Sequence, residues 1–190
     1  MNNAKDRNTV NQYVRIIGGL YRGKKISFPA IDGLRPTPDR VKETLFNWLM
    51  NEIRGARCLD AFAGSGALGF EALSRSAGQV VMIESSPRAF ESLKRLALTF
   101  NKPELTVINT DAQIYLRKIK EPYDIIFLDP PFKENYLEEC LSIITSGNCL
   151  TQGGLLYVES PVEILLDASI WSLRKSKKAG QVFYALFEKR

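Results

Sequence analysis

The chain has 190 residues, of which 45% are hydrophobic, and a formal net charge of +5 at neutral pH. This length and composition fit one globular domain with a small appendage, large enough to bury the core of a full sheet. The N-terminus lacks the apolar core of a signal peptide and no apolar stretch is long enough to span a membrane. We therefore expect a cytoplasmic protein with no membrane partner.

The sequence contains no histidine and three cysteines. Cys58, Cys140 and Cys149 are widely spaced among apolar neighbours, which favours reduced, buried thiols over disulfides or metal ligands. Histidine is the commonest metal ligand and the usual general base. We therefore expect no metal site and no chemistry that depends on a histidine base.

Positive charge is concentrated in the first third of the chain. Residues 1–57 carry 11 Lys and Arg against 5 Asp and Glu, a net of +6, whereas residues 58–190 carry 15 against 16, a net of −1. A solvated basic face is the simplest interpretation of scattered charges, but clustering at one end favours contacts with phosphate. The candidate phosphate-contacting residues are Arg22, Lys24, Lys25, Arg35 and Arg40, with Lys42 in the same cluster.

The N-terminal segment is expected to form a hairpin and a helix. Alternation around Gly18 and Gly19 predicts strands over Tyr13–Ile17 and Gly23–Phe28. Thr37 is then predicted to be a helix N-cap, with Pro38 at the first helical position. One helical face carries Val41, Leu45, Trp48 and Leu49, and the opposite face carries Arg40, Glu43 and Asn47. We expect residues 1–52 to form an extension of a domain over residues 53–190.

From residue 56 the pattern alternates between strand and helix. Strands are predicted at 56–61, 79–84, 105–109, 123–128 and 154–159, and helices near 67–76, 87–100, 112–119 and 134–146. Such alternation predicts an α/β fold with a doubly wound, mostly parallel Rossmann-like sheet. Residues 170–174 and 181–188 are predicted to end the chain as an antiparallel hairpin joined at Lys-Lys-Ala-Gly.

A glycine-rich turn follows the first strand of this domain. Gly64, Gly66 and Gly69 have the spacing of a dinucleotide-binding loop, and Glu84 lies 20 residues beyond Gly64, where a ribose-binding acid is expected. An NAD-dependent oxidoreductase is therefore a competing hypothesis. Glycines at such a turn suit either cofactor, because each requires the backbone to pass close to the ligand.

Three features favour S-adenosylmethionine over NAD. Asp60 places a carboxylate in the turn, where it would repel a pyrophosphate but could hold an ammonium group. Asp111, next to Ala112, could accept a hydrogen bond from an adenine amino group. Asp60, Glu84, Asp111 and Asp129 also place one acid at the end of each of four successive strands. The candidate cofactor-binding residues are Asp60, Ala61, Gly64, Ser65, Gly66, Glu84, Asp111 and Ala112.

The most specific motif is Asp129-Pro130-Pro131-Phe132, which directly follows the apolar run Ile125–Leu128. A continuous apolar run predicts a strand buried on both faces, and ligands bind at the carboxyl ends of such strands. Prolines have no N–H and a fixed φ, so the carboxylate and the Pro130 carbonyl form two rigid acceptors. Two acceptors suit an exocyclic amino group, with Phe132 available to stack on the attached ring. An ordinary stiff turn is the simpler interpretation of an Asp-Pro pair alone.

The whole chain resembles the bacterial 16S ribosomal RNA guanine-N2 methyltransferases, which are class I S-adenosylmethionine-dependent methyltransferases. The resemblance is carried by residues 15–19, 22–23, 35–49, 60–69, 129–132 and 180–182, of which 35–49 is the family-specific block. It implies transfer of a methyl group from S-adenosylmethionine to the N2 amino group of a guanine. The implied substrate is 16S rRNA in the 30S subunit or an assembly intermediate, with Asp129, Pro130, Pro131 and Phe132 at the catalytic centre.

Several alternatives remain open from the sequence. The Asp-Pro-Pro-Phe motif would also serve adenine-N6 methylation of RNA or DNA, and a non-catalytic RNA-binding factor could keep the same fold. Methylation at C5 of cytosine is disfavoured because it needs a cysteine nucleophile, and no cysteine lies at a strand-end motif. The target base must be unpaired or flipped out to reach the pocket. We expect a monomer that contacts RNA through its basic extension.

Overall fold

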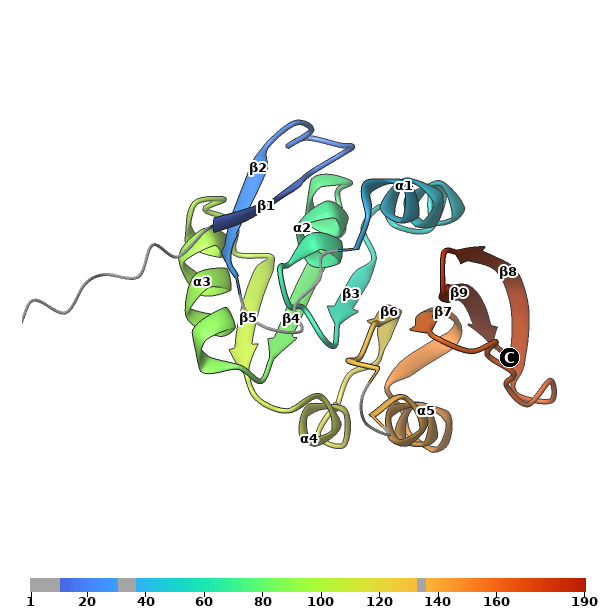
Figure 1. Cartoon of the computed structure of the whole chain (residues 1–190). Coiled ribbons are helices and arrows are strands. Elements are labelled where there is room, and N and C mark those ends of the chain that lie inside the picture. Colours follow the sequence, from blue (N-terminus) through green and yellow to red (C-terminus); the bar gives the residue numbers. More distant parts are fainter. Residues whose placement is uncertain (1–10, 31–36, 133–135) are drawn as a thin grey trace, which may run out of the picture.

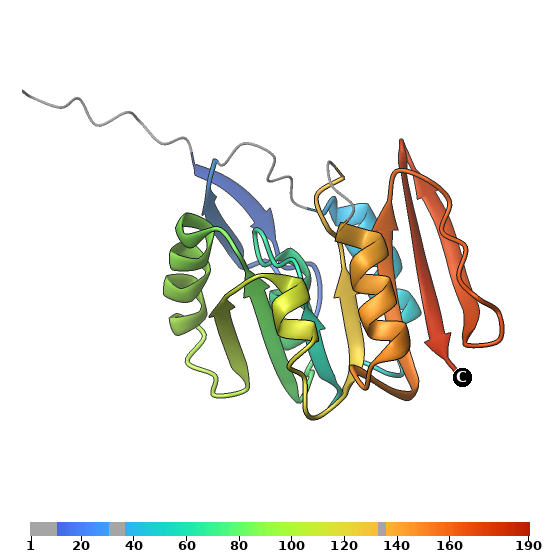
Figure 2. The ribbon, with the colours of Figure 1, turned by 90° about the horizontal axis from the view of Figure 1, so that it is seen from below.

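The computed structural model describes residues 11–30, 37–132 and 136–190. A seven-stranded sheet forms its centre, in the order β5-β4-β3-β6-β7-β9-β8 (Figures 1 and 2). The strands are β3 (Arg57–Asp60), β4 (Gln79–Glu84), β5 (Leu105–Asn109), β6 (Tyr123–Leu128), β7 (Leu150–Ser160), β8 (Trp171–Ala179) and β9 (Val182–Lys189). The strands from β3 to β7 pair in parallel, and β9 pairs antiparallel to both β7 and β8. The predicted doubly wound sheet with a terminal antiparallel hairpin is confirmed.

Helices cover both faces of the sheet. They are α1 (Asp39–Trp48), α2 (Ala67–Ser74), α3 (Pro87–Leu98), α4 (Ala112–Leu116) and α5 (Tyr136–Ser146). One hydrophobic core lies between the sheet and α1, α2 and α3, and a second lies between the sheet and α4 and α5. Figure 1 shows α1 and α2 on one side of the sheet and α4 and α5 on the other. The parallel strands are therefore buried on both faces, which explains their continuous apolar runs.

The N-terminal hairpin consists of β1 (Asn11–Arg15) and β2 (Lys25–Pro29), paired antiparallel as predicted. Its connecting loop is bound to α2: the N–H of Leu20 donates to the Ser74 carbonyl at 2.7 Å, and the N–H of Ile17 donates to the buried Glu71 carboxylate at 2.8 Å. Val14, Ile16, Ile26 and Phe28 enter the same hydrophobic core as α1 and α2. The hairpin is therefore packed onto the sheet domain, while the proposed boundary between residues 52 and 53 stays a prediction.

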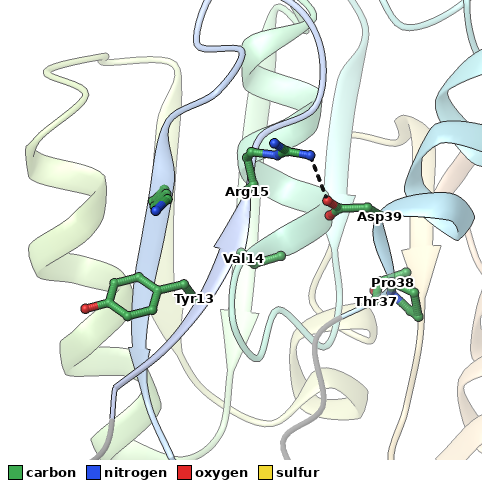
Figure 3. A pocket seen from close by; sticks show the side chains of 7 residues that line it. Tyr13, Val14, Arg15, Thr37, Pro38 and Asp39 are labelled. Carbon is green, nitrogen blue, oxygen red and sulfur yellow. Dashed lines mark ion pairs between the residues drawn. The ribbon is translucent and has the colours of Figure 1, made fainter.

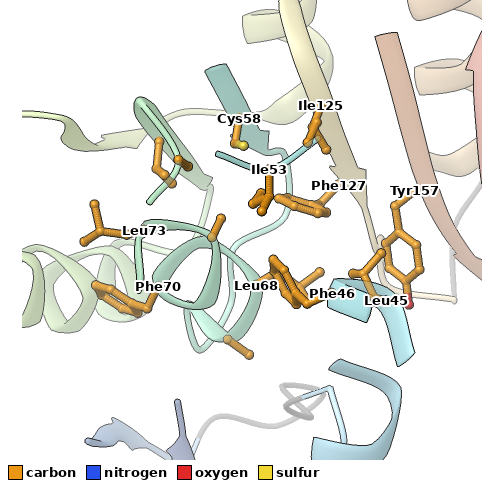
Figure 4. Packing of buried hydrophobic residues seen from close by; sticks show 14 of the residues in the cluster. Leu45, Phe46, Ile53, Cys58, Leu68, Phe70, Leu73, Ile125, Phe127 and Tyr157 are labelled. Atoms are coloured by element: carbon orange, nitrogen blue, oxygen red, sulfur yellow. The ribbon is translucent and has the colours of Figure 1, made fainter. Parts of the chain in front are cut away.

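Helix α1 packs its apolar face on the sheet as the spacing predicted. Leu45 and Phe46 are fully buried, and the Phe46 ring lies 5.9 Å from that of Phe127 in β6 (Figure 4). Trp48 is half-buried and stacks on Tyr184 of β9, with 5.4 Å between ring centroids. The predicted polar face, with Arg40, Glu43 and Asn47, is exposed.

Two local predictions were wrong. Pro38, rather than Thr37, precedes the first helical residue of α1, because the Pro38 carbonyl accepts from the N–H groups of Val41 and Lys42. Strand β8 continues to Ala179, so the Lys-Lys-Ala-Gly segment is mostly strand and the turn lies at Gly180, where φ is 60°. Pairing with β9 determines that strand, and its exposed charged residues hide the pattern from the sequence.

We predict that Gly19→Ala destabilises the protein by at least about 2 kcal/mol, because overpacking adds to the cost of a left-handed backbone. Gly19 has φ of 75°, and a Cβ there would overlap the Ser74 carbonyl. Gly23→Ala is the matched control, since Gly23 has φ of 88° but open space around it. Urea denaturation should give the larger loss for Gly19→Ala. Equal losses of stability in the two variants would show that the loop between β1 and β2 does not pack tightly against α2.

Candidate active site

Acidic side chains form a row along the carboxyl edge of the parallel sheet. In the order of the strands they are Asp111 after β5, Glu84 on β4, Asp60 on β3, Asp129 after β6 and Glu159 on β7. The predicted series of four acids is thus brought to one edge. The structure adds Glu159 as a fifth member.

The glycine-rich turn is held in place by two of these acids. The Glu84 carboxylate accepts from the N–H of Gly64 at 2.9 Å and from the N–H of Ser86 at 2.7 Å. Asp60 is buried and accepts from the N–H of Gly69 at 3.0 Å. Gly66 adopts φ of 79° just before α2, and a Cβ there would overlap the Phe70 ring. The turn therefore requires glycine for both conformation and packing.

The electrostatics of this turn suit a cation rather than a phosphate. Burial, helped by the Glu84 carboxylate and opposed by the Gly69 N–H, raises the pKa of Asp60 to about 7. Burial also raises the pKa of Glu84, although three backbone N–H groups oppose it. The buried Asp60 and half-buried Glu84 carboxyl groups beside the turn would repel a pyrophosphate and attract an ammonium group. Ala61 and Ser65, the other predicted residues of the turn, are both buried.

Asp111 has a structural task that the sequence did not predict. One of its carboxylate oxygens accepts from the N–H groups of Gln113 at 2.9 Å and Ile114 at 3.2 Å, so it caps the N-terminus of α4. Ala112 follows it and is buried. A contact from Asp111 or Ala112 to adenine stays a prediction.

The Asp-Pro-Pro-Phe motif lies at the tip of β6, between Asp60 and Glu159. Asp129 is partly exposed, Pro130 is buried, Pro131 is exposed, and Phe132 is 49% exposed. None of the described residues donates a hydrogen bond to the Asp129 carboxylate. Burial, together with the carboxylates of Glu159 and Asp60, raises the pKa of Asp129 well above its usual value. Among the described residues, the motif thus presents a carboxylate without a donor and an aromatic ring that is half exposed for stacking.

Glu159 was missed as a candidate from the sequence. It is 6% exposed, and the Tyr157 hydroxyl donates to its carboxylate at 2.7 Å. Burial raises its pKa, and the Tyr157 hydrogen bond opposes the shift. Its position at the end of the predicted strand 154–159 was the available signal, since the rule of one acid per strand end extends to this strand.

The basic residues do not form the single surface cluster that the sequence suggested. Lys42 is fully buried and pairs with Asp39 at 3.0 Å, so its place in that cluster was wrong. Lys24 is half-buried, with its ammonium 3.2 Å from the Thr99 hydroxyl and 3.7 Å from the Phe100 ring centroid. Those partners follow the C-terminal end of α3, so Lys24 lies at the edge of the sheet opposite the acids. Arg22 is exposed in the same loop.

Lys25 and Arg40 are exposed, whereas Arg35 lies outside the described residues. A pocket of about 440 Å³ lies between the hairpin and the start of α1 (Figure 3). It is lined by Tyr13, Val14, Arg15, Lys25, Thr37, Pro38 and Asp39. Arg15 pairs with Asp39 at 3.6 Å beside it. RNA binding by the basic residues stays a prediction.

The remaining site predictions concern metals, cysteines and membranes. Cys58, Cys140 and Cys149 are free and buried, as expected. Over residues 11–30, 37–132 and 136–190, no three His, Cys, Asp or Glu side chains are grouped as metal ligands. In the same ranges no helix has the length and apolarity to cross a membrane.

The parallel sheet, the glycine-rich turn and the row of acids define an α/β methyltransferase. A solved Escherichia coli structure assigned as a methyltransferase superposes with a TM-score of 0.86 at 44% identity, covering 94% of this chain and 99% of that one. A solved Haemophilus influenzae structure assigned as a methylase superposes with a TM-score of 0.81 at 41% identity, covering 94% of this chain and 99% of that one. These structures share the fold over nearly the whole chain.

Sequence comparison gives the family. Residues 14–188 match the family described as Conserved hypothetical protein 95. The chain is 45% identical to the ribosomal RNA small subunit methyltransferase D of Escherichia coli over 93% of its own length and 90% of that protein. The Haemophilus influenzae protein of the same name is 43% identical over 92% of this chain and 93% of that protein. The chain therefore belongs to the family of these small-subunit rRNA methyltransferases and is a class I methyltransferase. The competing hypothesis of an NAD-dependent oxidoreductase is not supported.

We predict that Asp60 makes the free energy of unfolding depend on pH. Between about pH 4 and 7 the folded protein keeps a proton on Asp60 that the unfolded chain releases. The stabilisation from this proton is complete below about pH 4 and is lost as the pH rises through 7, with a slope of up to about 1.4 kcal/mol per unit. The free energy of unfolding would be measured by urea denaturation for wild type and for Asp60→Asn. The wild-type value minus the Asp60→Asn value should therefore fall as the pH rises. Parallel curves would contradict the raised pKa.

Proposed function

We propose that the protein transfers a methyl group from S-adenosylmethionine to the exocyclic N2 amino group of a guanine in 16S rRNA. The observation that carries this proposal is the Asp129 carboxylate, which has no donor among the described residues and lies beside Pro130 at the edge where ligands bind. The relatives named as small-subunit rRNA methyltransferases support the substrate. The substrate is the 30S subunit or an assembly intermediate, and the protein acts as a monomer.

The residues around the glycine-rich turn fit S-adenosylmethionine, which supplies a methyl group on a positively charged sulfur. Asp60 would hold the ammonium of the methionine part, because its buried carboxylate is oriented by the backbone N–H groups of Gly69 and Phe62 and gains from a cation. Glu84 would accept from the ribose hydroxyls with the lone pairs that Gly64 and Ser86 leave free. Gly64, Ser65 and Gly66 would let the backbone approach, with Asp111 and Ala112 contacting the adenine.

Asp129 and the Pro130 carbonyl would hold the two N–H bonds of the target amino group. Its lone pair is delocalised into the ring, so it is a weak nucleophile. Two acceptors favour a tetrahedral nitrogen and stabilise the positive charge that grows on it during transfer. S-adenosylmethionine would supply the methyl group and leave as a neutral thioether, and the Asp129 carboxylate that accepts from the nitrogen would then take up its excess proton. No histidine is needed, and Phe132 would replace the stacking partners of the flipped base.

We predict that Asp129→Ala lowers methyl transfer by at least about 100-fold while S-adenosylmethionine binding changes by less than about threefold. Incorporation of tritiated methyl groups into 16S rRNA and 30S particles, followed by identification of the nucleoside, measures the transfer. Equilibrium binding of labelled S-adenosylmethionine measures the second quantity.

Asp167→Asn is the control for this experiment, because Asp167 is exposed in the loop before β8. It should keep wild-type activity. Loss of cofactor binding rather than transfer in Asp129→Ala would contradict the role of Asp129. N6-methyladenosine as the product would instead support the adenine alternative, and no product from wild type would support a non-catalytic RNA-binding factor.

We predict that Lys25 and Arg40 contact RNA phosphates. Each lost contact should reduce the slope of log affinity against log salt by about 0.7 to 0.9. Binding of 16S rRNA would be measured for Lys25→Ala and Arg40→Ala over a salt series. Lys120→Ala is the control, because Lys120 is exposed just before β6 and lies outside the basic N-terminal extension. An unchanged slope in both test variants would place the RNA elsewhere.

A further inference from the structure

Glu159 lies directly beside Asp129 at the carboxyl edge of the sheet. Strands β6 and β7 pair in parallel with Leu128 opposite Val158, so the next residues, Asp129 and Glu159, occupy equivalent positions. Neighbouring strands are about 4.8 Å apart, and residues in register point to the same face of the sheet. Two carboxylates therefore lie side by side where the target base is expected.

The aromatic residues two positions before Asp129 and Glu159 indicate which face of the sheet these side chains occupy. Phe127 and Tyr157 are also in register, and their ring centroids are 6.4 Å apart on the face covered by α1. Side chains two residues apart on a strand share a face. Glu159 obeys this rule, because the Tyr157 hydroxyl reaches its carboxylate. The Asp129 and Glu159 pair thus continues the Phe127 and Tyr157 pair toward the edge.

The surroundings leave this pair short of hydrogen-bond donors. Tyr157 donates to Oε1 of Glu159, and no other described residue donates to that carboxylate or to Asp129. Among the described strand residues in register on this face are Asp60 on β3, Tyr157 on β7 and Tyr184 on β9, and none of these three is a cation. Adjacent carboxylates repel each other when both are ionised. A ligand with several adjacent N–H groups would offset this repulsion by donating to both.

Guanine offers such a row of donors. Its Watson–Crick edge carries the N1–H next to the N2 amino group, so three N–H bonds point from neighbouring atoms. Adenine presents its amino group beside N1, which has a lone pair and no hydrogen. With the amino group held at Asp129, the neighbouring ring nitrogen faces Glu159. A carboxylate there attracts the N1–H of guanine and repels the lone pair of adenine.

We propose that Glu159 accepts a hydrogen bond from N1–H of the target base and thereby selects guanine. The inference rests on the proposed function, since it assumes that the amino group binds at Asp129. Tyr157 then acts as a positioning residue that fixes one oxygen of Glu159 and leaves the other for the base. Glu159 is only 6% exposed, so water compensates poorly for a lost donor and the discrimination is strengthened.

The test compares guanine with 2-aminopurine, which has the same 2-amino group but no hydrogen on N1. Small-subunit RNA is assembled with 2-aminopurine in place of the guanine that the wild-type protein modifies, and kcat/KM is measured for both substrates. Wild type should prefer guanine by about 10- to 100-fold, the value of one hydrogen bond to a charged acceptor. Glu159→Gln, whose amide can donate to N1, should lose guanine activity by a similar factor and reduce the preference to about threefold or less.

Glu163→Gln is the matched control, because Glu163 is exposed four residues further along the chain. This variant should prefer guanine over 2-aminopurine by the same factor as wild type. The affinity for S-adenosylmethionine should change by less than about twofold in all variants. An equal loss on both substrates in Glu159→Gln would show a structural role and overturn the proposal.

The wild-type protein provides a test that needs no substitution. If it used 2-aminopurine as well as guanine, the inference would be overturned even if Glu159→Gln did not fold. The proposed function fails separately, when wild-type protein and natural RNA give no N2-methylguanosine.

Discussion

The arrangement of this protein depends on a row of acidic side chains that the parallel sheet brings to one edge, where none of them forms an ion pair with another described residue. Parallel strands end together, so acids that are far apart in the sequence meet at the carboxyl edge. Asp60, Asp129 and Glu159 each have a raised pKa, and burial is the largest cause in every case. Perturbed carboxyl groups gathered at one edge of a sheet are typical of functional sites, which supports the proposed roles of these residues.

The acids of this row differ in their hydrogen-bond donors, and the difference follows the strand order. Glu84 and Asp60 are fixed by backbone N–H groups of the glycine-rich turn and its helix, so their free lone pairs have defined directions. Asp129 and Glu159 have fewer donors and lie on the other side of Asp60. The first pair suits a co-substrate that carries its own cation and hydroxyls. The second pair suits a base that arrives with N–H groups.

The N-terminal segment contributes more to the core than its basic composition suggested. Its hairpin and α1 share one hydrophobic core with α2 and the sheet, and Lys42 is buried beside Asp39. A lysine in a charged cluster looks exposed in the sequence, but on a helix its side depends on which face packs. Lys24 is similarly held between Thr99 and Phe100 rather than directed to solvent. Charge counts therefore indicated a basic segment without identifying its exposed residues.

The sequence by itself determined the alternation of strands and helices, the glycine-rich turn, the four acids at strand ends and the Asp-Pro-Pro-Phe motif. These features depend on local periodicity and on residues whose backbone preferences are strong, as for Gly66 and Pro130. Only the tertiary structure decided that Glu159 lies beside Asp129, that Asp111 caps α4 and that Lys42 is buried. Each of these depends on strand register or helix orientation, which arise from packing between segments distant in the chain.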